Sequence, residues 1–249
     1  MLDFKAHKVS ITVLLSITFL SIFLATIAWG VLKSKDDMVK IKEAQTQEAH
    51  FLLATVDFAT EQQRLVLYVR DIVYDEWKRI KYKGNYDKAF EIAFAIVKEA
   101  TKYPYVPVEQ YALFMASIQY QESRFQDSAK SPMDALGIAQ FVPSTGRMMA
   151  RIIGVEYSDS LLYNAEASIR MQAIFLDILM SSNHMDMELV AAEYNGGNNG
   201  PWYWAHDKSK LSNETLKYVP EVMNRYKGFL EVYKTYRVTL EAAAQQAQQ

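Results

Sequence analysis

Hydrophobic positions recur at helical spacing along most of this chain. The clearest case runs from Asp87 to Thr101, where the apolar residues are Ala89, Phe90, Ile92, Ala93, Ile96 and Val97. This spacing predicts an amphipathic helix. The run Lys83-Gly84-Asn85 breaks the pattern before this helix, and Pro104 and Pro107 separate it from the next.

The same pattern predicts further helices downstream. From Val108, apolar positions lead to Glu122, so this carboxylate is expected near a helix C-terminus, where the helix dipole raises the pKa of an acid. Helices are also predicted over residues 144–153, 166–180, 187–194 and 215–236, and strand signals are weak throughout. The predicted fold class is mainly α, with a catalytic domain over residues 85–236 and a frayed tail over 237–249.

Residues 34–84 are charged and rich in Gln at first, then apolar at helical spacing. The apolar positions are Phe51, Leu52, Val56, Phe58, Ala59, Leu65, Tyr68, Val69, Ile72 and Val73. We predict one or two long helices that serve as a stalk and outer packing layer; a partner-binding or dimerising helix is the alternative.

The stretch from Ile11 to Leu32 carries no charged residue. As a helix it matches the ~30 Å hydrocarbon core of a bilayer, so residues 1–33 are predicted to be a single transmembrane anchor. A cleaved secretory signal is the alternative, with Ala28 or Gly30 before the cut.

The flanking charges oppose the expected orientation of this anchor. The lysines before it are Lys5 and Lys8, and those after it are Lys33, Lys35, Lys40 and Lys42. Positive residues favour the cytoplasmic side. The chemistry described next still leads us to expect an inner-membrane protein with its catalytic domain in the periplasm.

Composition narrows the function classes. Half of the residues are hydrophobic, and 27 Lys and Arg nearly balance 29 Asp and Glu, so no excess charge favours nucleic acid as a partner. There is no Cys, and the four His are scattered without the spacing of zinc peptidases. We predict no catalytic metal and no cofactor.

Glu122 is the strongest candidate for chemistry. It ends an apolar helix and precedes a loop of small and polar residues, Ser131-Pro132-Met133-Asp134-Ala135-Leu136-Gly137-Ile138-Ala139-Gln140. Apolar surroundings raise a carboxyl pKa, and polar loop groups orient a substrate, which suits an acid that cleaves a glycosidic bond.

Four ordered motifs carry a family resemblance. They are Glu122-Ser123-Arg124-Phe125, the run from Ser131 to Gly146, Ala192-Glu193-Tyr194-Asn195-Gly196-Gly197, and Glu214-Thr215-Leu216-Lys217-Tyr218-Val219. In order and spacing they resemble the SLT-type lytic transglycosylases, which have a lysozyme-like fold and cleave peptidoglycan.

The resemblance implies that Glu122 acts as the single general acid and base. It would protonate the oxygen between N-acetylmuramic acid and N-acetylglucosamine, then deprotonate the muramoyl C6 hydroxyl as it closes onto C1. The product is a 1,6-anhydro end.

Substrate-binding roles are implied for five further residues. Ser131 matches the motif serine near the glycosidic centre, and Gln140 matches a cleft-lining glutamine; turn-capping and helix-capping are their respective alternatives. Tyr194 matches a tyrosine that orients the acid, Asn195 a polar cleft or turn residue, and Tyr218 a tyrosine that lines the cleft. Buried packing is the alternative for both tyrosines.

Two loop positions depart from the family pattern. Asp134 stands where Gly is usual, and Ala139 stands where Met is usual. A second carboxylate near Glu122 would activate water, so Asp134 raises the alternative of a muramidase-type hydrolase. An inactive glycan-binding or structural component of the same fold is the other alternative.

Two expectations remain. Trp202, Tyr203 and Trp204 follow the Gly-rich third motif and form either a sugar-stacking surface or part of the core. The small size and the stalk favour local wall opening, with peptidoglycan strands as substrate and a larger secretion or phage assembly as a candidate partner.

Overall fold

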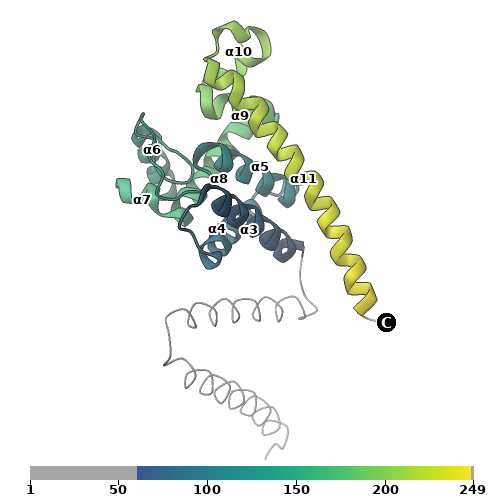
Figure 1. Ribbon diagram of the computed structural model, residues 1–249. Helices are drawn as coiled ribbons and strands as arrows, with labels where there is room; N and C mark the ends of the chain where they lie inside the picture. Colours follow the sequence, from purple (N-terminus) through teal and green to yellow (C-terminus); the bar gives the residue numbers. More distant parts are fainter. Residues whose placement is uncertain (1–60, 248–249) are drawn as a thin grey trace, which may run out of the picture. The chain divides into compact units, whose positions relative to one another are not determined.

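The computed structural model describes residues 61–247, and the regular structure in this range is helical (Figure 1). The elements are α3 (Glu61–Ile80), α4 (Tyr86–Ala100), α5 (Val108–Ser123), α6 (Pro143–Ile153), α7 (Asp159–Tyr163), α8 (Ala165–Ser182), α9 (Met187–Gly196), α10 (Gly200–His206), the short 3-10 helix η2 (Lys208–Lys210) and α11 (Asn213–Ala247). Within this range, β pairing is limited to isolated bridges of Leu136 with Lys130 and with Phe141. The mainly α prediction is therefore confirmed for the described residues.

Helix α5 lies at the centre of the fold. Every side chain from Tyr111 to Gln119 is fully buried, as expected of a helix with neighbours on all sides. Helices α3, α4 and α11 pack against it, and the Tyr111 hydroxyl donates a hydrogen bond to the Ala173 carbonyl of α8 at 2.7 Å. Helix α5 is thereby held by α3, α4, α8 and α11.

Helix α3 belongs to this domain and not to a separate stalk. Its buried residues include Leu65, Val69, Val73 and Trp77, which join the same core as α4 and α5. One compact unit extends from Thr60 to the end of the chain, so α3 lies in the same unit as the helices after residue 85. An apolar stripe shows that a helix is amphipathic, but it does not show which surface the stripe covers.

Helix α11 is longer than predicted. It passes α9, α5 and α3 and continues to Ala247 (Figure 1), so the expected tail over 237–249 is helical up to that residue. After Gly228 the helix contains no further Gly or Pro, and its last turns consist mostly of Ala and Gln. These residues favour helix even where little packing supports them.

Apolar side chains form two clusters. The larger one joins α3, α4, α5, α8, α9 and α11. The smaller one lies around α6, α7 and the loop before them, and consists of Leu136, Ala139, Phe141, Met149, Leu162 and Met171. The candidate site draws its residues from both clusters.

The predicted anchor from Ile11 to Leu32 lies outside the described residues, as do the other residues before Glu61. Among the helices that are described, none has the length and apolar character needed to cross a membrane.

Candidate active site

Glu122 lies in the last turn of α5, as predicted. The chain reverses directly after the helix, because Arg124 and Phe125 both have positive φ, at 54° and 62°. The fully buried Phe125 ring anchors this reversal. In addition, the Ser123 hydroxyl donates to the Ile138 carbonyl at 2.8 Å, which ties the helix end to the following loop.

Burial raises the pKa of Glu122 from its ordinary 4.5 to about 7. Two neighbours modify this effect: a hydrogen bond from the Tyr218 hydroxyl lowers the pKa, and the charge of Glu214 raises it. The Tyr218 hydroxyl donates to Glu122 Oε1 at 2.6 Å. Near neutral pH the carboxyl therefore exists in both forms, as a group that first donates and then accepts a proton must.

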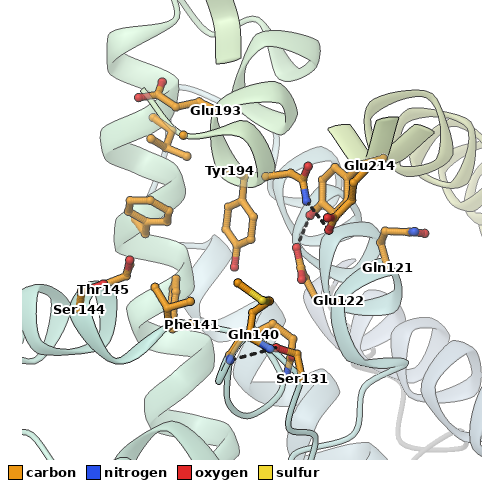
Figure 2. A pocket seen from close by; sticks show the side chains of 18 of the residues that line it. Gln121, Glu122, Ser131, Gln140, Phe141, Ser144, Thr145, Glu193, Tyr194 and Glu214 are labelled. Atoms are coloured by element: carbon orange, nitrogen blue, oxygen red, sulfur yellow. Dashed lines mark hydrogen bonds between the residues drawn. The ribbon is translucent and has the colours of Figure 1, made fainter. Parts of the chain in front are cut away.

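Glu122 faces a cleft of about 1030 Å³, and its labelled lining residues are seen in Figure 2. We call one side the helical wall; it consists of Gln121, Glu122, Glu214, Lys217, Tyr218 and Glu221 from α5 and α11. We call the other side the loop wall; it consists of Ser131, Pro132, Met133, Gln140, Phe141, Val142, Ser144, Thr145 and Met148. Residues of α8 and α9 and of the loop after α9 also line the cleft; they are Phe175, Leu179, Glu193, Tyr194, Asn195, Gly197 and Asn198.

The helical wall follows from the spacing of residues on α11. Glu214, Lys217, Tyr218 and Glu221 lie three or four positions apart, so one face of the helix presents all of them to the cleft. The Gln121 amide donates to Glu221 Oε2 at 2.6 Å, which joins α5 to α11 along this wall. The helical wall is therefore predominantly charged.

The loop wall is apolar at its rim. Met133 is 81% exposed, Met148 44% and Val142 37%. Exposed apolar side chains of this size on a cleft rim are typical of a surface that contacts a ligand. The cleft thus presents a charged wall opposite an apolar rim.

Gly137 sets the path of the loop. It has a φ of 74°, and a Cβ atom added to it would lie 1.8 Å from the Leu162 carbonyl oxygen. Only glycine fits this backbone conformation and this approach. Its amide donates to the Ala129 carbonyl at 2.8 Å, and the Leu136 amide donates to the Phe141 carbonyl at 3.0 Å, which closes the loop.

Ser131 and Gln140 both line the cleft, as predicted. Each also holds the loop together, the alternative considered for Ser131. The Ser131 Oγ accepts hydrogen bonds from the amides of Met133 and Ala135, at 3.2 and 3.0 Å. The Gln140 Nε2 donates to the Gly137 carbonyl at 2.8 Å. The Ser131 hydroxyl proton and the Gln140 amide oxygen remain available to form hydrogen bonds with a ligand.

Asp134 does not line the cleft beside Glu122. Its side chain is 69% exposed and pairs with Lys130 Nζ at 2.9 Å. Its φ of 58° explains why this position suits Gly, and Asp is among the residues that tolerate the left-handed conformation. The structure therefore accounts for Asp134 as a turn residue.

Tyr194 was expected to orient the acid and Tyr218 to line the cleft, but the hydrogen bond to the acid comes from Tyr218. The Tyr194 hydroxyl points into the space beside Glu122 (Figure 2), but it donates its hydrogen bond to the Ala139 carbonyl at 2.8 Å. Tyr218, expected only to line the cleft, is the residue that holds the Glu122 carboxyl. The expectation that Tyr194 orients the acid through its hydroxyl is therefore wrong, because that hydroxyl is used to fix the loop.

Asn195 joins α9 to the start of α11. Its Oδ1 accepts from the Thr215 hydroxyl at 2.7 Å, and its Nδ2 donates to Glu214 Oε1 at 3.2 Å. It also lines the cleft, as expected. Asn195 thus positions Glu214, one of the two neighbours that affect the pKa of Glu122.

Sequence reasoning missed part of the lining. The residues not anticipated include Met133, Glu193, Glu214, Lys217 and Glu221. For those on α11 a signal existed, because residues three or four positions from Tyr218 share its helix face. No such signal exists for Met133, whose exposure depends on the loop conformation.

Among the described residues, no group of three His, Asp or Glu side chains is arranged to hold a metal ion. The run of Trp202, Tyr203 and Trp204 contributes nothing to the lining of the cleft.

A helical fold around a buried central helix, with one carboxyl of raised pKa at the head of an open cleft, defines a lysozyme-like domain. Comparison with protein families gives a match to the transglycosylase SLT domain over residues 97–217. These residues, just under half of the chain, therefore form a transglycosylase SLT domain.

Comparison with solved structures gives one match that supports the same fold and a second, weaker match. An inactive mutant of lytic transglycosylase Slt from Pseudomonas aeruginosa matches 79% of this chain at 20% identity, with a TM-score of 0.50. The 70 kDa soluble lytic transglycosylase of Escherichia coli matches 74% at 18% identity, with a TM-score of 0.48. The match covers 35% and 32% of those two chains, about a third of each. None of the curated proteins matches the sequence.

Proposed function

We propose that this protein cleaves the β-1,4 bond between N-acetylmuramic acid and N-acetylglucosamine in peptidoglycan by lytic transglycosylation. Glu122 is the single acid and base. The observation that carries this proposal is the carboxyl itself, whose pKa burial raises to about 7 at the head of a large cleft. Membership of the SLT domain family over residues 97–217 supports the same reaction.

The first step is proton transfer to the glycosidic oxygen. Because the Tyr218 hydroxyl donates to Glu122 Oε1, the acid's proton resides on Oε2. The C1–O bond then breaks, and the oxygen leaves with this proton on the N-acetylglucosamine side. Burial of the carboxyl favours its neutral form before the reaction and therefore favours this donation.

In the second step, Glu122 is a carboxylate. It removes the proton of the muramoyl C6 hydroxyl as that oxygen bonds to C1 and closes the 1,6-anhydro ring. The carboxyl is protonated again at the end, so the cycle consumes no water. The hydrogen bond from Tyr218 stabilises the carboxylate between the two steps.

Hydrolysis is the competing reaction, and it requires a base that activates water. Asp134 is a poor candidate, because it is exposed and paired with Lys130 outside the cleft lining. The cleft does hold Glu214, whose carboxylate is bound by Asn195. The mass of the products decides between the two reactions.

We would digest purified peptidoglycan with the full chain and determine the masses of the released muropeptides. Anhydro ends, each lighter than a reducing end by one water, are expected. Reducing ends as the main product would refute the transglycosylase proposal and support a muramidase.

Glu122→Gln should reduce turnover by at least about a thousandfold, since the amide cannot donate the proton. Glycan binding should persist, because Gln has nearly the same shape. The matched control is Glu156→Gln, an exposed residue outside the cleft lining. Wall clearance by Glu122→Gln at the wild-type rate would show that another residue is the acid, and loss of glycan binding as well as turnover would indicate an inactive or misfolded domain.

For the setting, we propose a single-pass inner-membrane protein that opens the wall locally from the periplasm, as part of a secretion or phage assembly. The apolar stretch from Ile11 to Leu32 supports the anchor. A reporter enzyme fused after Gln249 should be active only in the periplasm. Reporter activity in the cytoplasm would refute this orientation. The test matters because more lysines follow the apolar stretch than precede it, and positive residues favour the cytoplasmic side.

A further inference from the structure

Trp202 is an exposed aromatic residue on α10, outside the cleft. Its side chain is 58% exposed, whereas Trp204 of the same helix packs against the main core and has Lys208 Nζ 3.8 Å from its ring centroid. A large aromatic side chain exposed to this extent loses the free energy that burial would provide. A ligand that covers the indole would recover it.

The indole is held in one orientation by its neighbours. The His206 ring stacks on it, with centroids 5.0 Å apart and planes at 20°. His206 Nδ1 lies 2.9 Å from the Trp202 carbonyl oxygen, a hydrogen bond that fixes the imidazole. Tyr203 contacts the indole edge-to-face at 5.5 Å. The imidazole covers one face of the indole. The exposed part of Trp202 is therefore its opposite face and the edges that Tyr203 leaves open.

The chain links this surface closely to the cleft. Asn195, Gly197 and Asn198 line the cleft, and α10 begins at Gly200, whose amide donates to the Gly197 carbonyl at 2.7 Å. A Cβ atom at Gly200 would lie 2.2 Å from the Ala192 carbonyl oxygen of α9. Only glycine permits this contact, so α10 is packed tightly on the helix that carries Tyr194 and Asn195, as Figure 1 shows.

The segments that flank α10 in the sequence distinguish between kinds of ligand. Asn198 and Asn199 before the helix, and Lys208, Ser209 and Lys210 after it, are all exposed and polar. Large contiguous apolar patches mark the surfaces that bind a protein partner or a bilayer. A single fixed aromatic face among hydrogen-bonding side chains fits a sugar ring, which has an apolar C–H face and polar hydroxyl edges.

We propose that the open face of Trp202 is a second sugar-binding site, which holds the glycan strand beyond the catalytic cleft. The inference rests on the proposed function, because it takes the same polymer as ligand. A strand that occupies the cleft extends past its end, and the loop from Gly197 to Asn199 leads from the cleft lining directly to this helix. Contact at both places keeps the enzyme on the strand between cleavage events.

The test uses the full chain carrying Glu122→Gln, so that bound glycan is not cut. Binding is measured by co-sedimentation with purified peptidoglycan sacculi and by titration with glycan strands from which the peptides have been removed. Trp202→Ala should weaken binding to both about five- to tenfold, the equivalent of one aromatic stacking contact. Trp202→Phe keeps an aromatic face and should weaken binding by only about twofold.

Phe94→Ala is the matched control, since Phe94 of α4 is 51% exposed and lies outside the cleft lining. It should leave binding unchanged, and thermal melts should show that all variants are folded. Unchanged binding by Trp202→Ala, equal loss in the Phe94→Ala control, or a loss seen only with peptide-bearing glycan would each overturn the proposal. Failure of the wild-type protein to form anhydro ends would refute the proposed reaction, while the binding comparison would still give its own result.

Discussion

The two walls of the cleft are built in different ways. The helical wall is formed by α5 and α11, which pack on the large core. The loop wall rests on the smaller cluster around Leu136 and Phe141, and its shape depends on positive φ at Asp134, Gly137 and Gln140. The proposed acid therefore lies on the wall with the larger core. The loop wall, which carries the exposed apolar side chains, depends on a few backbone conformations.

The largest effect is expected at Gly137, which sets the path of the loop that carries the loop wall. Gly137→Ala places a methyl group 1.8 Å from the Leu162 carbonyl oxygen, at a φ of 74°. The loop or α7 must move, so we expect a loss of about 3 kcal/mol or more in the free energy of unfolding. Thermal denaturation should show a decrease in Tm of at least about 6 °C.

Gly154 provides the control for backbone strain alone. It has the same φ of 74°, but nothing lies within 4 Å of an added Cβ atom. Gly154→Ala should therefore cost only about 1 kcal/mol. Equal losses in the two variants would mean that the close approach to Leu162 does not determine the path of the loop.

The next effect concerns the helical wall and its buried acid. The pKa of Glu122 is about 7 in the folded protein, above its ordinary 4.5. Between these values the folded state holds a proton that the unfolded state has released, so stability decreases as pH rises from about 4.5 to 7 and then levels off. Glu122→Gln removes this dependence.

Chemical denaturation at pH 5 and pH 8 measures the difference. Relative to wild type, Glu122→Gln should gain about 2–3 kcal/mol more at pH 8 than at pH 5. The Glu156→Gln control should show no such change, since Glu156 is exposed. A pH-independent difference between wild type and Glu122→Gln would show that the carboxyl is not destabilised by burial.

Sequence patterns predicted the helical wall better than the loop wall. The period of apolar residues placed α5 and the carboxyl at its end correctly, because these depend on local spacing. The start of α11 was placed within a few residues, and its face follows from Tyr218. The end of α11 was not found, because Ala and Gln continue a helix without any hydrophobic signal.

Contacts between distant residues explain the remaining differences. Tyr194 and Tyr218 are both motif tyrosines beside the acid, and only the fold decides which hydroxyl reaches Glu122 and which reaches Ala139. Asp134 is similar: its residue type raised the hypothesis of a second acid, whereas its φ of 58° shows a turn position. The direction of a side chain and the sign of a residue's φ depend on tertiary structure, which the spacing of residues along the chain does not encode.

A smaller effect on the helical wall is expected from Tyr218→Phe. The hydrogen bond from Tyr218 lowers the pKa of Glu122, so its removal should raise that pKa further. We expect kcat/KM to decrease about ten- to hundredfold, and the alkaline limb of its pH profile to move to higher pH. Tyr226→Phe, on the same helix but outside the cleft lining, is the control and should change neither. A loss of activity without a shifted pH profile would indicate that Tyr218 acts on substrate and not on the acid.

The smallest effect is expected at Asp134, which lies in the loop that carries the loop wall but outside the cleft lining. Asp134→Asn removes the charge that pairs with Lys130, and Asn tolerates the positive φ of 58° as Asp does. An exposed ion pair of this kind contributes less than about 1 kcal/mol to the free energy of unfolding. The fold should therefore be kept, and turnover of peptidoglycan should change by less than about twofold. The products should remain anhydro ends, because the carboxylate that is removed lies outside the cleft lining. Mass analysis of the muropeptides, with Asp134→Gly as a second variant that restores the freest backbone at this turn, tests the assignment. If both variants changed the ratio of anhydro to reducing ends, Asp134 would act on the reaction, and the chemistry would depend on both walls of the cleft.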